Sequence, residues 1–497
     1  MTGDRLALGT LGWVPEELRP VVDPRSLDVG VTHLGVGAFH RAHQAVYTEG
    51  AVAASGDTRW GIAGFTSRSG AVADLLGPQD GLYTVLERDD DTARARVVGV
   101  LRDVRSGSGD PGAVLDRLAH GSTAVVTLTV TEKGYRHNPA TGRLSLYDAE
   151  IAADLAGRPP VTVVGRLVRG LQRRMRDDAG PVSVLCCDNF PSSGRVLAGL
   201  VDDFVAALPS AEGDRLGAWI EAHAAFPDSM VDRITPATTD ADLRDARDLL
   251  GLRDEAVVVT EPFSQWVIED RFAADRPPWE RAGVQLTASV EPYERAKLRL
   301  LNGSHSTVAY LGALAGYDTI AAAMRDEAIE AVVARLMADD VTPTLDPPEG
   351  VDLVEYGRTV LHRFRNEALG HTTRQVAMDG SQKLGPRLLG TIADALAAGR
   401  EPRWATLGVA AWMRYVSASA SDSGTPLTLD DPLAERIRTA TRSVSTAAGI
   451  VDGLLGVTEI FDPALARGSF RDLLVDWLDR LRGDGVRATL RRAIAAS

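Results

Sequence analysis

Lys297, Asn302 and His305 are three polar residues of different chemistry within one short stretch of the sequence. Pro292 precedes them and suits a first helical turn, because proline lacks the N–H that has no partner there. At about 100° per residue, His305 lies roughly 80° from Lys297 and Asn302 roughly 140° from it, over about 12 Å of helix axis. A helix would therefore present all three on one broad face, over a length comparable with an extended six-carbon chain.

These three groups suit chemistry on a substrate rich in hydroxyls. A lysine serves as a general base when burial or neighbouring cations lower its pKa, and Arg295 and Arg299 are close enough in sequence to supply such cations. An asparagine can donate to a developing oxyanion, and a histidine can hydrogen-bond an adjacent hydroxyl. The alternative interpretation is a solvated helix face, which the spacing by itself does not exclude.

A strand followed by a glycine-rich turn and a helix could hold a cofactor. Residues 28–36 predict the strand, which runs into Gly35 and Gly37, and residues 38–54 predict the helix. In a dinucleotide-binding unit such glycines let the backbone approach a pyrophosphate, and the helix N-terminus favours negative charge. The third glycine of the fingerprint is absent, because His40 stands at that position. A tight structural turn therefore remains an alternative.

The second predicted strand, residues 60–65, bears on which nicotinamide cofactor is used. An acidic residue after this strand binds the ribose 2′-OH of NAD, whereas an arginine accommodates the 2′-phosphate of NADP. Here the strand is followed by Arg68, and no acidic residue occurs before Asp74. NAD is the expected cofactor and Arg68 leaves NADP open, unless this arginine is simply solvated.

Further candidate residues follow other predicted strands, where an open α/β sheet binds its ligands. Residues 124–131 predict a buried strand that ends at Thr131 and Glu132, and this loop could line the nicotinamide. Residues 182–187 predict another strand, followed by Asp188 and Asn189. Asn189 could instead cap the helix predicted over 192–208. Asp232 could contact cofactor or substrate, or could have a structural role with Arg233.

The overall composition narrows the class of protein. With 497 residues the chain is long enough for two or three domains, and 44 % hydrophobic and 25 % charged residues are ordinary for a globular protein. A net charge of −14 disfavours nucleic-acid and membrane partners, which need clustered Lys and Arg. Cys186 and Cys187 are adjacent and lack a metal-binding spacing, so we expect no disulfide, no metal site and a cytoplasmic location. Neither a signal peptide nor a transmembrane helix is predicted.

The order of the predicted elements indicates two domains. Strands and helices alternate up to residues 257–260, as in a doubly wound sheet, and helical periodicity dominates after about residue 289. We therefore expect an α/β Rossmann-like N-terminal domain, residues 1–290, and a mostly α-helical substrate and catalytic domain, residues 291–497. The later helices are predicted over residues 307–314, 320–337, 351–365, 381–398, 404–417, 434–448 and 470–481.

Several separated segments, taken together, resemble the mannitol dehydrogenase family of polyol-specific long-chain dehydrogenases. The matching segments occur in family order at residues 37–44, 79–84, 187–189, 226–236, 292–305 and 374–384. The resemblance implies a metal-independent, NAD(P)-dependent oxidoreductase acting on D-mannitol and D-fructose, or on D-mannonate and D-fructuronate. It also implies that Gly35, Gly37, Ala38 and Phe39 bind the cofactor. Where the family often has a second asparagine, this chain has Ser193.

The resemblance also implies roles in catalysis. Lys297 would be the general base, Asn302 and Asn189 would stabilise the reacting oxygen, His305 would orient a neighbouring hydroxyl, and Glu294 would help pass the proton to solvent. These implied roles sharpen the chemistry suggested by the residue types. They leave the assembly open, as a monomer or a small homo-oligomer.

Substrate choice would depend on the polar segment that contains Arg374 and Lys383, either of which could bind a hydroxyl or a carboxylate. Mannitol-oxidising members more often have Arg where Gln375 stands and His where Met378 stands, so this version is similar to fructuronate-reductase-like members. Three alternatives remain: a mannitol-1-phosphate 5-dehydrogenase that also takes fructose 6-phosphate, a non-catalytic nucleotide-binding regulator, and a zinc alcohol dehydrogenase.

Overall fold

In the computed structural model, the chain divides into two compact units, Met1–Glu291 and Pro292–Ser497. The structure describes residues 4–89, 92–138 and 141–496, so the first three residues of the predicted 1–290 domain lie outside the described residues. Within these described ranges, every helix is too short or too polar to cross a lipid bilayer.

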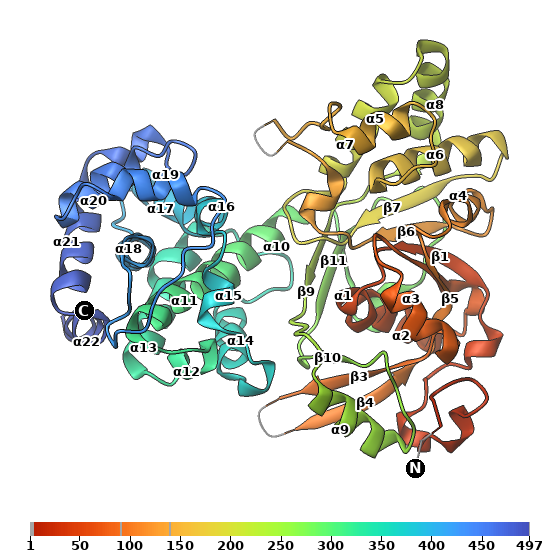
Figure 1. Ribbon diagram of the computed structural model, residues 1–497, viewed down its shortest axis with the longest axis horizontal. Coiled ribbons are helices and arrows are strands. Elements are labelled where there is room, and N and C mark those ends of the chain that lie inside the picture. Colours follow the sequence, from red (N-terminus) through yellow and green to blue (C-terminus); the bar gives the residue numbers. More distant parts are fainter. Residues whose placement is uncertain (1–3, 90–91, 139–140, 497) are drawn as a thin grey trace. The chain divides into compact units, whose positions relative to one another are not determined.

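The N-terminal unit is built on a parallel six-stranded sheet (Figure 1), in the spatial order β5-β2-β1-β6-β7-β8. Its strands are β1 (Val29–Leu34), β2 (Gly61–Thr66), β5 (Leu101–Ser106), β6 (Val125–Leu128), β7 (Val182–Cys186) and β8 (Ala224–Ala225). Numbered along the chain, this is the 3-2-1-4-5-6 order of a dinucleotide-binding fold, in which ligands bind where the strand order reverses. The reversal falls between β1 and β6, and the predicted fold class is confirmed.

Apolar side chains point to both faces of this sheet and form two separate cores. Leu34, Phe65 and Leu128 face one core, while Val31 and Ile62 face the other. The alternation along each strand explains why two layers of helices can bury the sheet. The helices of this unit are α1 (Ala38–Ala42), α2 (Gln44–Ser55), α3 (Ala71–Leu76), α4 (Pro111–Ala119), α5 (Ala149–Leu155), α6 (Val163–Arg176), α7 (Ser193–Ala206), α8 (Ser210–His223) and α9 (Asp240–Leu250).

Two smaller sheets interrupt the simple alternation that the sequence predicted. Their strands are β3 (Tyr83–Arg88), β4 (Ala93–Val98) and β10 (Val258–Thr260), then β9 (Ser229–Asp232), β11 (Gln265–Glu269) and β12 (Gln285–Thr287). The strand predicted at residues 257–260 therefore pairs with β3 outside the main sheet. The helix predicted at 38–54 is also divided, because His43 leaves helical geometry at φ −122°, ψ −86°.

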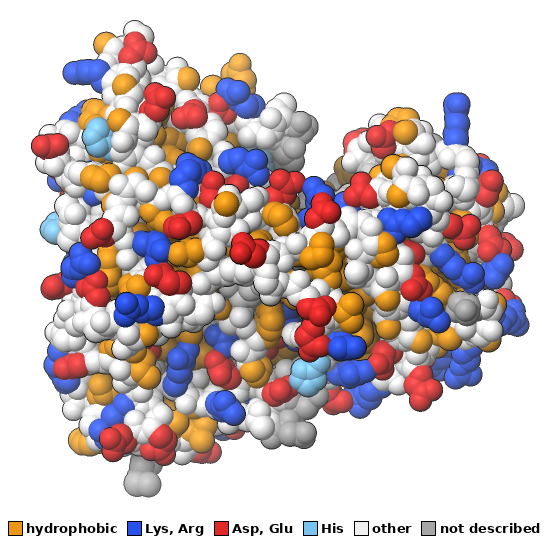
Figure 2. Space-filling model, turned by 180° about the vertical axis from the view of Figure 1, so that it is seen from behind, with side chains coloured by type: hydrophobic (Ala, Val, Ile, Leu, Met, Phe, Trp, Pro, Cys, Tyr) orange, Lys and Arg blue, Asp and Glu red, His pale blue; other side chains and the backbone are white. Residues whose placement is uncertain are grey.

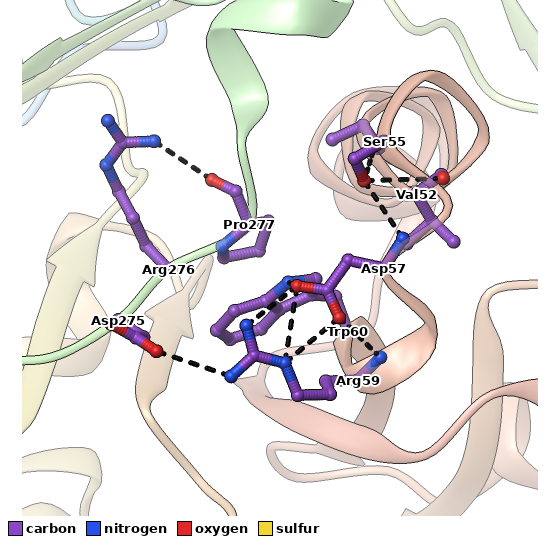
Figure 3. Close-up of polar contacts among 9 residues, drawn as sticks. Val52, Ser55, Asp57, Arg59, Trp60, Asp275, Arg276 and Pro277 are labelled. Atoms are coloured by element: carbon purple, nitrogen blue, oxygen red, sulfur yellow. Dashed lines mark hydrogen bonds and ion pairs between the residues drawn. The ribbon is translucent and has the colours of Figure 1, made fainter.

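A dense polar turn fixes the start of β2 (Figure 3). The Asp57 carboxylate accepts hydrogen bonds from the backbone N–H of Arg59 at 3.2 Å and from Nε1 of Trp60 at 2.8 Å. Arg59 also pairs with Asp275 at 3.3 Å, so a distant segment is joined to this turn. The Ser55 hydroxyl accepts from the Asp57 N–H at 3.2 Å and links the turn to the end of α2.

The C-terminal unit is helical and has one extensive apolar core. Its α-helices are α10 (Glu291–Ala296), α11 (Ser304–Ala315), α12 (Ile320–Met324), α13 (Glu327–Arg335), α14 (Leu353–Arg365), α15 (Thr373–Ala377), α16 (Gly380–Leu384), α17 (Gly390–Ala397), α18 (Arg403–Ser417), α19 (Ala434–Thr441), α20 (Ala447–Leu455), α21 (Ser469–Gly483) and α22 (Val486–Ala495). Helices α11 and α18 are buried along almost their whole length and pack against each other. At their contact a Cβ on Gly408 would lie 2.7 Å from Oγ1 of Thr307, so only glycine allows this approach.

Several predicted helices are divided by capping residues. The helix predicted over 320–337 breaks after α12, because the Asp326 side chain accepts the N–H of Ala328 at 3.0 Å and starts α13. The helix predicted over 434–448 breaks similarly, where Thr446 caps α20. Helix α22 was not predicted. Three segments are π-helical: η8 (Lys297–Gly303), η9 (Leu336–Val341) and η12 (Gly385–Leu389).

Acidic and basic side chains are interspersed over the face drawn in Figure 2. Many of them form surface ion pairs, such as Arg471 with Asp452 at 2.7 Å. Such exposed pairs contribute at most about 1 kcal/mol each, so they affect solubility more than stability.

Candidate active site

The glycine-rich turn lies at the carboxyl end of β1, where the strand order reverses. Gly35 has φ +103°, and a Cβ there would lie 2.1 Å from the carbonyl oxygen of Thr129, so the protein's own packing requires glycine. Gly37 differs, because its φ is −116° and a Cβ at that position would have its nearest neighbouring atom 3.7 Å away. No contact in the described protein demands glycine at 37, and its missing side chain leaves room over the backbone for a ligand.

Ala38 and Phe39 begin α1 directly after this turn and are partly exposed. The Phe39 ring stacks on His43, with the ring centroids 5.0 Å apart. In any helix the first N–H groups point toward the N-terminus and lack partners within the helix, so those of α1 face the turn. The arrangement suits a ligand that carries negative charge close to backbone amides.

A cavity of about 330 Å³ opens beside this turn. Its walls come from the ends of β1, β2 and β6 and from the start of α6, and they include Gly35, Arg68, Thr131 and Arg166. Glu132 stands on the exposed part of the loop after β6, where its Oε1 lies 3.7 Å from Nε2 of His137. The structure therefore brings Gly35, Arg68 and Thr131 to one cavity, at the place where sequence reasoning expected a dinucleotide.

Asp188 holds the loop after β6 in shape. Its carboxylate accepts the N–H groups of Val130 and Thr131, both at 2.9 Å, and the Tyr135 hydroxyl at 2.7 Å. Thr131 adopts φ +68°, a region that residues with a Cβ rarely occupy. Burial raises the pKa of Asp188, although these three donors act in the opposite direction. These three hydrogen bonds, called the Asp188 clamp below, keep Thr131 and its strained backbone in the cavity wall.

Asn189 and Asp232 lie at two other strand ends of the N-terminal unit. Asn189 follows β7 and is exposed, and Asp232 is the buried last residue of β9. The N-cap position of α7 is occupied by Ser192, at φ +50°, rather than by Asn189, and Ser192 makes no side-chain capping hydrogen bond there. Arg233 is a structural residue, because its guanidinium bonds to the carbonyl oxygens of Ala42 and Glu261.

The stretch that contains Lys297 is a continuous helix whose centre is widened. Segments α10, η8 and α11 follow one another with right-handed helical backbone at both junctions, Ala296 and Ser304. A π-helix has more residues per turn than an α-helix, so the angles estimated at 100° per residue do not hold between Lys297 and Gly303. A Cβ on Gly303 would lie 2.7 Å from the carbonyl oxygen of Arg387, which shows how closely η12 packs on this segment.

Lys297, Asn302 and Glu294 are all buried in this helix, with 6 %, 6 % and 7 % of their surface exposed. Oδ1 of Asn302 has no hydrogen-bond partner among the described residues. Buried polar atoms without a partner in the protein are rare, so Oδ1 of Asn302 is available to hydrogen-bond a substrate or a water. The second cation suggested from the sequence, Arg299, is neutralised by an ion pair with Asp394 at 2.7 Å.

His305 lies near several cationic side chains. Its ring stacks on Phe364 at 4.8 Å and lies 5.9 Å from His371, measured between ring centroids. Burial lowers the pKa of His305 well below its usual range, and the charges of Arg387 and Lys383 act in the same direction. The ring is therefore neutral at ordinary pH and can both donate and accept a hydrogen bond.

Lys383 and Arg374 have different environments. Nζ of Lys383 donates to the carbonyl oxygens of Met378 and Val376, and burial lowers its pKa to about 8, with Arg387 acting in the same direction. Arg374 is exposed on α15. Of the two predicted substrate residues, the structure thus brings Lys383 near His305. Gln375 closes a capping box with Thr372, whose N–H lies 3.3 Å from Oε1 of Gln375.

Comparison with known proteins decides the family. Residues 29–281 match the mannitol dehydrogenase Rossmann domain, and residues 289–473 match the mannitol dehydrogenase C-terminal domain. The chain belongs to the mannitol dehydrogenase family. The family prediction made from the sequence is therefore confirmed.

Individual members of the mannitol dehydrogenase family match nearly the whole chain. The D-mannonate oxidoreductase of Escherichia coli (strain K12) is 39 % identical over 448 residues, which cover 89 % of this chain and 91 % of that protein. The mannitol 2-dehydrogenase of Pyrenophora tritici-repentis (strain Pt-1C-BFP) is 38 % identical over 84 % of this chain and 74 % of that protein. The structure of Pseudomonas fluorescens mannitol 2-dehydrogenase in a ternary complex with NAD and D-mannitol is 37 % identical and has a TM-score of 0.85, covering 99 % and 100 % of the two chains.

Some residues of this candidate site were not indicated by the sequence. Arg387 and His371 lie near His305 only because η12 packs against η8 and α15 packs against α11, so no local spacing indicated them. Asp188 was noticed at its strand end, but its role as a clamp depends on contacts with the neighbouring loop. A charged residue directly after a buried strand is the one signal that could have indicated it.

Proposed function

We propose that the protein is an NAD-dependent, metal-independent dehydrogenase that interconverts D-mannonate and D-fructuronate, with Lys297 as general base. The observation that carries the choice of substrate is the set of cations around His305, since a hexuronate has a carboxylate that neutral polyols lack. Arg363, Lys383 and Arg387 all contribute to the electrostatic field at His305. The 39 % identity to a D-mannonate oxidoreductase supports the same substrate class.

The residues at the carboxyl end of the sheet fit a dinucleotide. Gly37 leaves open space above the backbone, and the cavity beside Gly35 and Thr131 is of the volume expected for part of a cofactor site. We propose that Gly35, Gly37, Ala38, Phe39 and the loop after β6, with Thr131 and Glu132, hold the NAD, and that Asp232 also contributes. When bound, NAD supplies the hydride acceptor for oxidation of the alcohol. In this assignment residues 1–290 bind the cofactor.

All but one of the proposed catalytic groups belong to the C-terminal domain, residues 291–497, and the exception, Asn189, belongs to the N-terminal unit. In oxidation, Lys297 removes the proton of the reacting hydroxyl while its carbon loses hydride and becomes a carbonyl. Asn302 stabilises the alkoxide-like oxygen, and Asn189 is proposed to assist. His305, kept neutral by its surroundings, hydrogen-bonds the adjacent hydroxyl. Glu294 precedes Lys297 by three residues on a helix and is proposed to carry the proton onward.

The substrate carboxylate is assigned to Lys383, with Arg387 beside it and Arg374 as the outer, exposed cation. Burial makes protonated Lys383 costly by itself, so an anion that compensates its charge would bind favourably. Arg387 is already fixed in place, because its guanidinium donates to the Ser306 hydroxyl at 2.9 Å. A prearranged cation loses little conformational freedom when the ligand arrives.

The second candidate reaction is the oxidation of D-mannitol to D-fructose. It is supported by the 38 % identity to a mannitol 2-dehydrogenase and by the similarity to the Pseudomonas fluorescens structure. The same cations around His305 would also suit a phosphate, so fructose 6-phosphate is a comparison substrate in any assay.

Initial rates of NADH oxidation with D-fructuronate, D-fructose and D-fructose 6-phosphate test the proposal. We expect kcat/KM to be highest for D-fructuronate, and turnover of Lys297→Ala to fall by about 10²–10⁴, the usual contribution of a general base, with NADH still bound. A preference for fructose would refute the proposed substrate, whereas near-normal turnover of Lys297→Ala would refute the proposed base.

A further inference from the structure

The cavity at the ends of β2 and β6 has an unusual balance of charges for an NAD site. Four cationic side chains line it, whereas Glu150 is its one acidic residue among those described. Glu150 is ion-paired with Arg136, which also pairs with Asp148 at 3.0 Å, so the charges of Glu150 and Arg136 are both compensated and the excess positive charge comes from the other three cations. The cationic residues are Arg68, Lys133, Arg136 and Arg166.

The position that usually selects NAD holds no carboxylate here. In dinucleotide-binding folds an acidic residue beyond the second strand accepts the hydrogen bond of the ribose 2′-OH and repels a 2′-phosphate. Strand β2 ends at Thr66, and the residues that follow it into the cavity wall are Ser67 and Arg68. A phosphate at this position would meet a hydroxyl and a guanidinium.

The loop that carries Ser67 and Arg68 is fixed by hydrogen bonds to its backbone carbonyl oxygens. Arg166 is buried, with 5 % of its surface exposed, and it donates to the carbonyl oxygens of Ser67 at 3.3 Å and Pro160 at 3.2 Å. The Ser108 hydroxyl donates to the carbonyl oxygen of Arg68 at 2.9 Å. The backbone around Arg68 is therefore fixed by donors from two other segments.

The side chain of Arg68 is exposed at the cavity mouth and makes no ion pair within the described part of the chain. Other exposed arginines nearby are already paired, as Arg105 is with Asp103 at 2.8 Å. A guanidinium with its donors available can bind a phosphate through two parallel hydrogen bonds.

We propose that this cavity accepts the 2′-phosphate of NADP(H), with Arg68 as its principal ligand, so that the protein uses NADP(H) as well as NAD(H). The inference rests on the proposed function of the N-terminal unit and adds to it the identity of the adenosine end. Ser67 provides a hydroxyl to the phosphate, and Arg166 adds positive charge from beneath the loop.

Equilibrium binding to the full-length protein tests this without sugar substrate. Dissociation constants are measured by fluorescence for NADPH and NADH, and by calorimetry for 2′,5′-ADP. We expect tight NADPH binding to the wild type, and about a tenfold weakening of NADPH and 2′,5′-ADP in Arg68→Ala, with NADH changed less than about twofold. Arg105→Ala, which removes an arginine from the adjacent strand, should change neither.

A second variant should shift the cofactor preference toward NADH. Ser67→Asp places a carboxylate beside the ribose, so NADPH should weaken by about tenfold or more while NADH is retained or improved. Tight NADH binding without NADPH binding, or equal losses for both in Arg68→Ala, would overturn the inference while leaving the proposed dehydrogenase intact. If neither nucleotide binds, the proposed function fails together with the inference.

Discussion

Replacing Asn302 by alanine should lower activity and yet preserve or raise stability, a combination that separates a functional residue from a structural one. The carboxamide is 6 % exposed, and its Oδ1 has no hydrogen-bond partner among the described residues. A buried residue of this kind contributes an unsatisfied acceptor to the folded protein. Most buried polar residues behave in the opposite way, because they are bonded.

The magnitude follows from three contributions to the free energy of unfolding. An unsatisfied buried acceptor costs about 1–3 kcal/mol, which the substitution removes. Alanine also has a helix propensity about 0.6 kcal/mol better than asparagine. Loss of the three side-chain heavy atoms costs about 1 kcal/mol in packing. The net change in Asn302→Ala is a gain of about 0.5–2.5 kcal/mol, or roughly 1–10 °C in Tm for a unit of this size.

The kcat of Asn302→Ala should fall although its stability is preserved or raised. If the Asn302 side chain stabilises the oxygen that becomes charged, its removal costs about 2.7–4 kcal/mol, or about 10²–10³ in kcat. The assay combines calorimetric Tm with initial rates of NADH oxidation, both on the complete protein. Neither measurement alone would distinguish the role, because a destabilised variant also loses activity.

Asn366 offers a matched control in the same unit. It is 7 % exposed, but its Oδ1 accepts the N–H of Ala368 at 3.0 Å as a helix cap. Asn366→Ala should therefore lose about 1 kcal/mol, or about 2–4 °C, with little change in kcat. A fall in Tm of Asn302→Ala as large as that of Asn366→Ala, or an unchanged kcat, would refute the reasoning.

Two further predictions concern pH and the loop after β6. Because Lys383 has a folded pKa of about 8, its charge is present below that pH and lost above it, so KM for D-fructuronate should rise as pH passes about 8. Lys383→Met should have a higher KM that no longer changes there, and an unaltered pH profile in that variant would exclude Lys383. Asp188→Ala removes the acceptor of three hydrogen bonds and lets Thr131 relax from φ +68°, so the Kd for NADH should rise about tenfold. Fluorescence titration checks this, and an unchanged Kd would mean that the clamp does not shape the cofactor site.

Much of the fold could be read from the sequence, because the patterns that specify it are local. The apolar residues Val29, Val31 and Leu34 indicated a strand, and the two glycines after it indicated a tight turn. Gly35 at φ +103° against the Thr129 carbonyl shows the physical basis of that signal. The spacing of Lys297, Asn302 and His305 likewise placed all three on one continuous helix.

The pairing of distant strands and the exact ends of helices could not be predicted from local sequence patterns. The strand at residues 257–260 has the composition of a buried sheet strand, yet its partner is β3 rather than a strand of the main sheet. The predicted helices break at Asp326 and Thr446 because these side chains accept hydrogen bonds from backbone N–H groups at the start of the next helix. Such choices are decided by small differences in capping energy that composition does not reveal.

The sequence by itself therefore determined the chemical groups, their order and the elements that carry them. Tertiary structure alone decided the environment of each group. Packing of Gly303 against the Arg387 carbonyl accompanies the widened turn that contains Lys297 and Asn302, and the packing of η12 against η8 brings Arg387 near His305. These features arise from contacts between residues far apart in the chain, and burial then amplifies their electrostatic effects, because charges interact more strongly away from water.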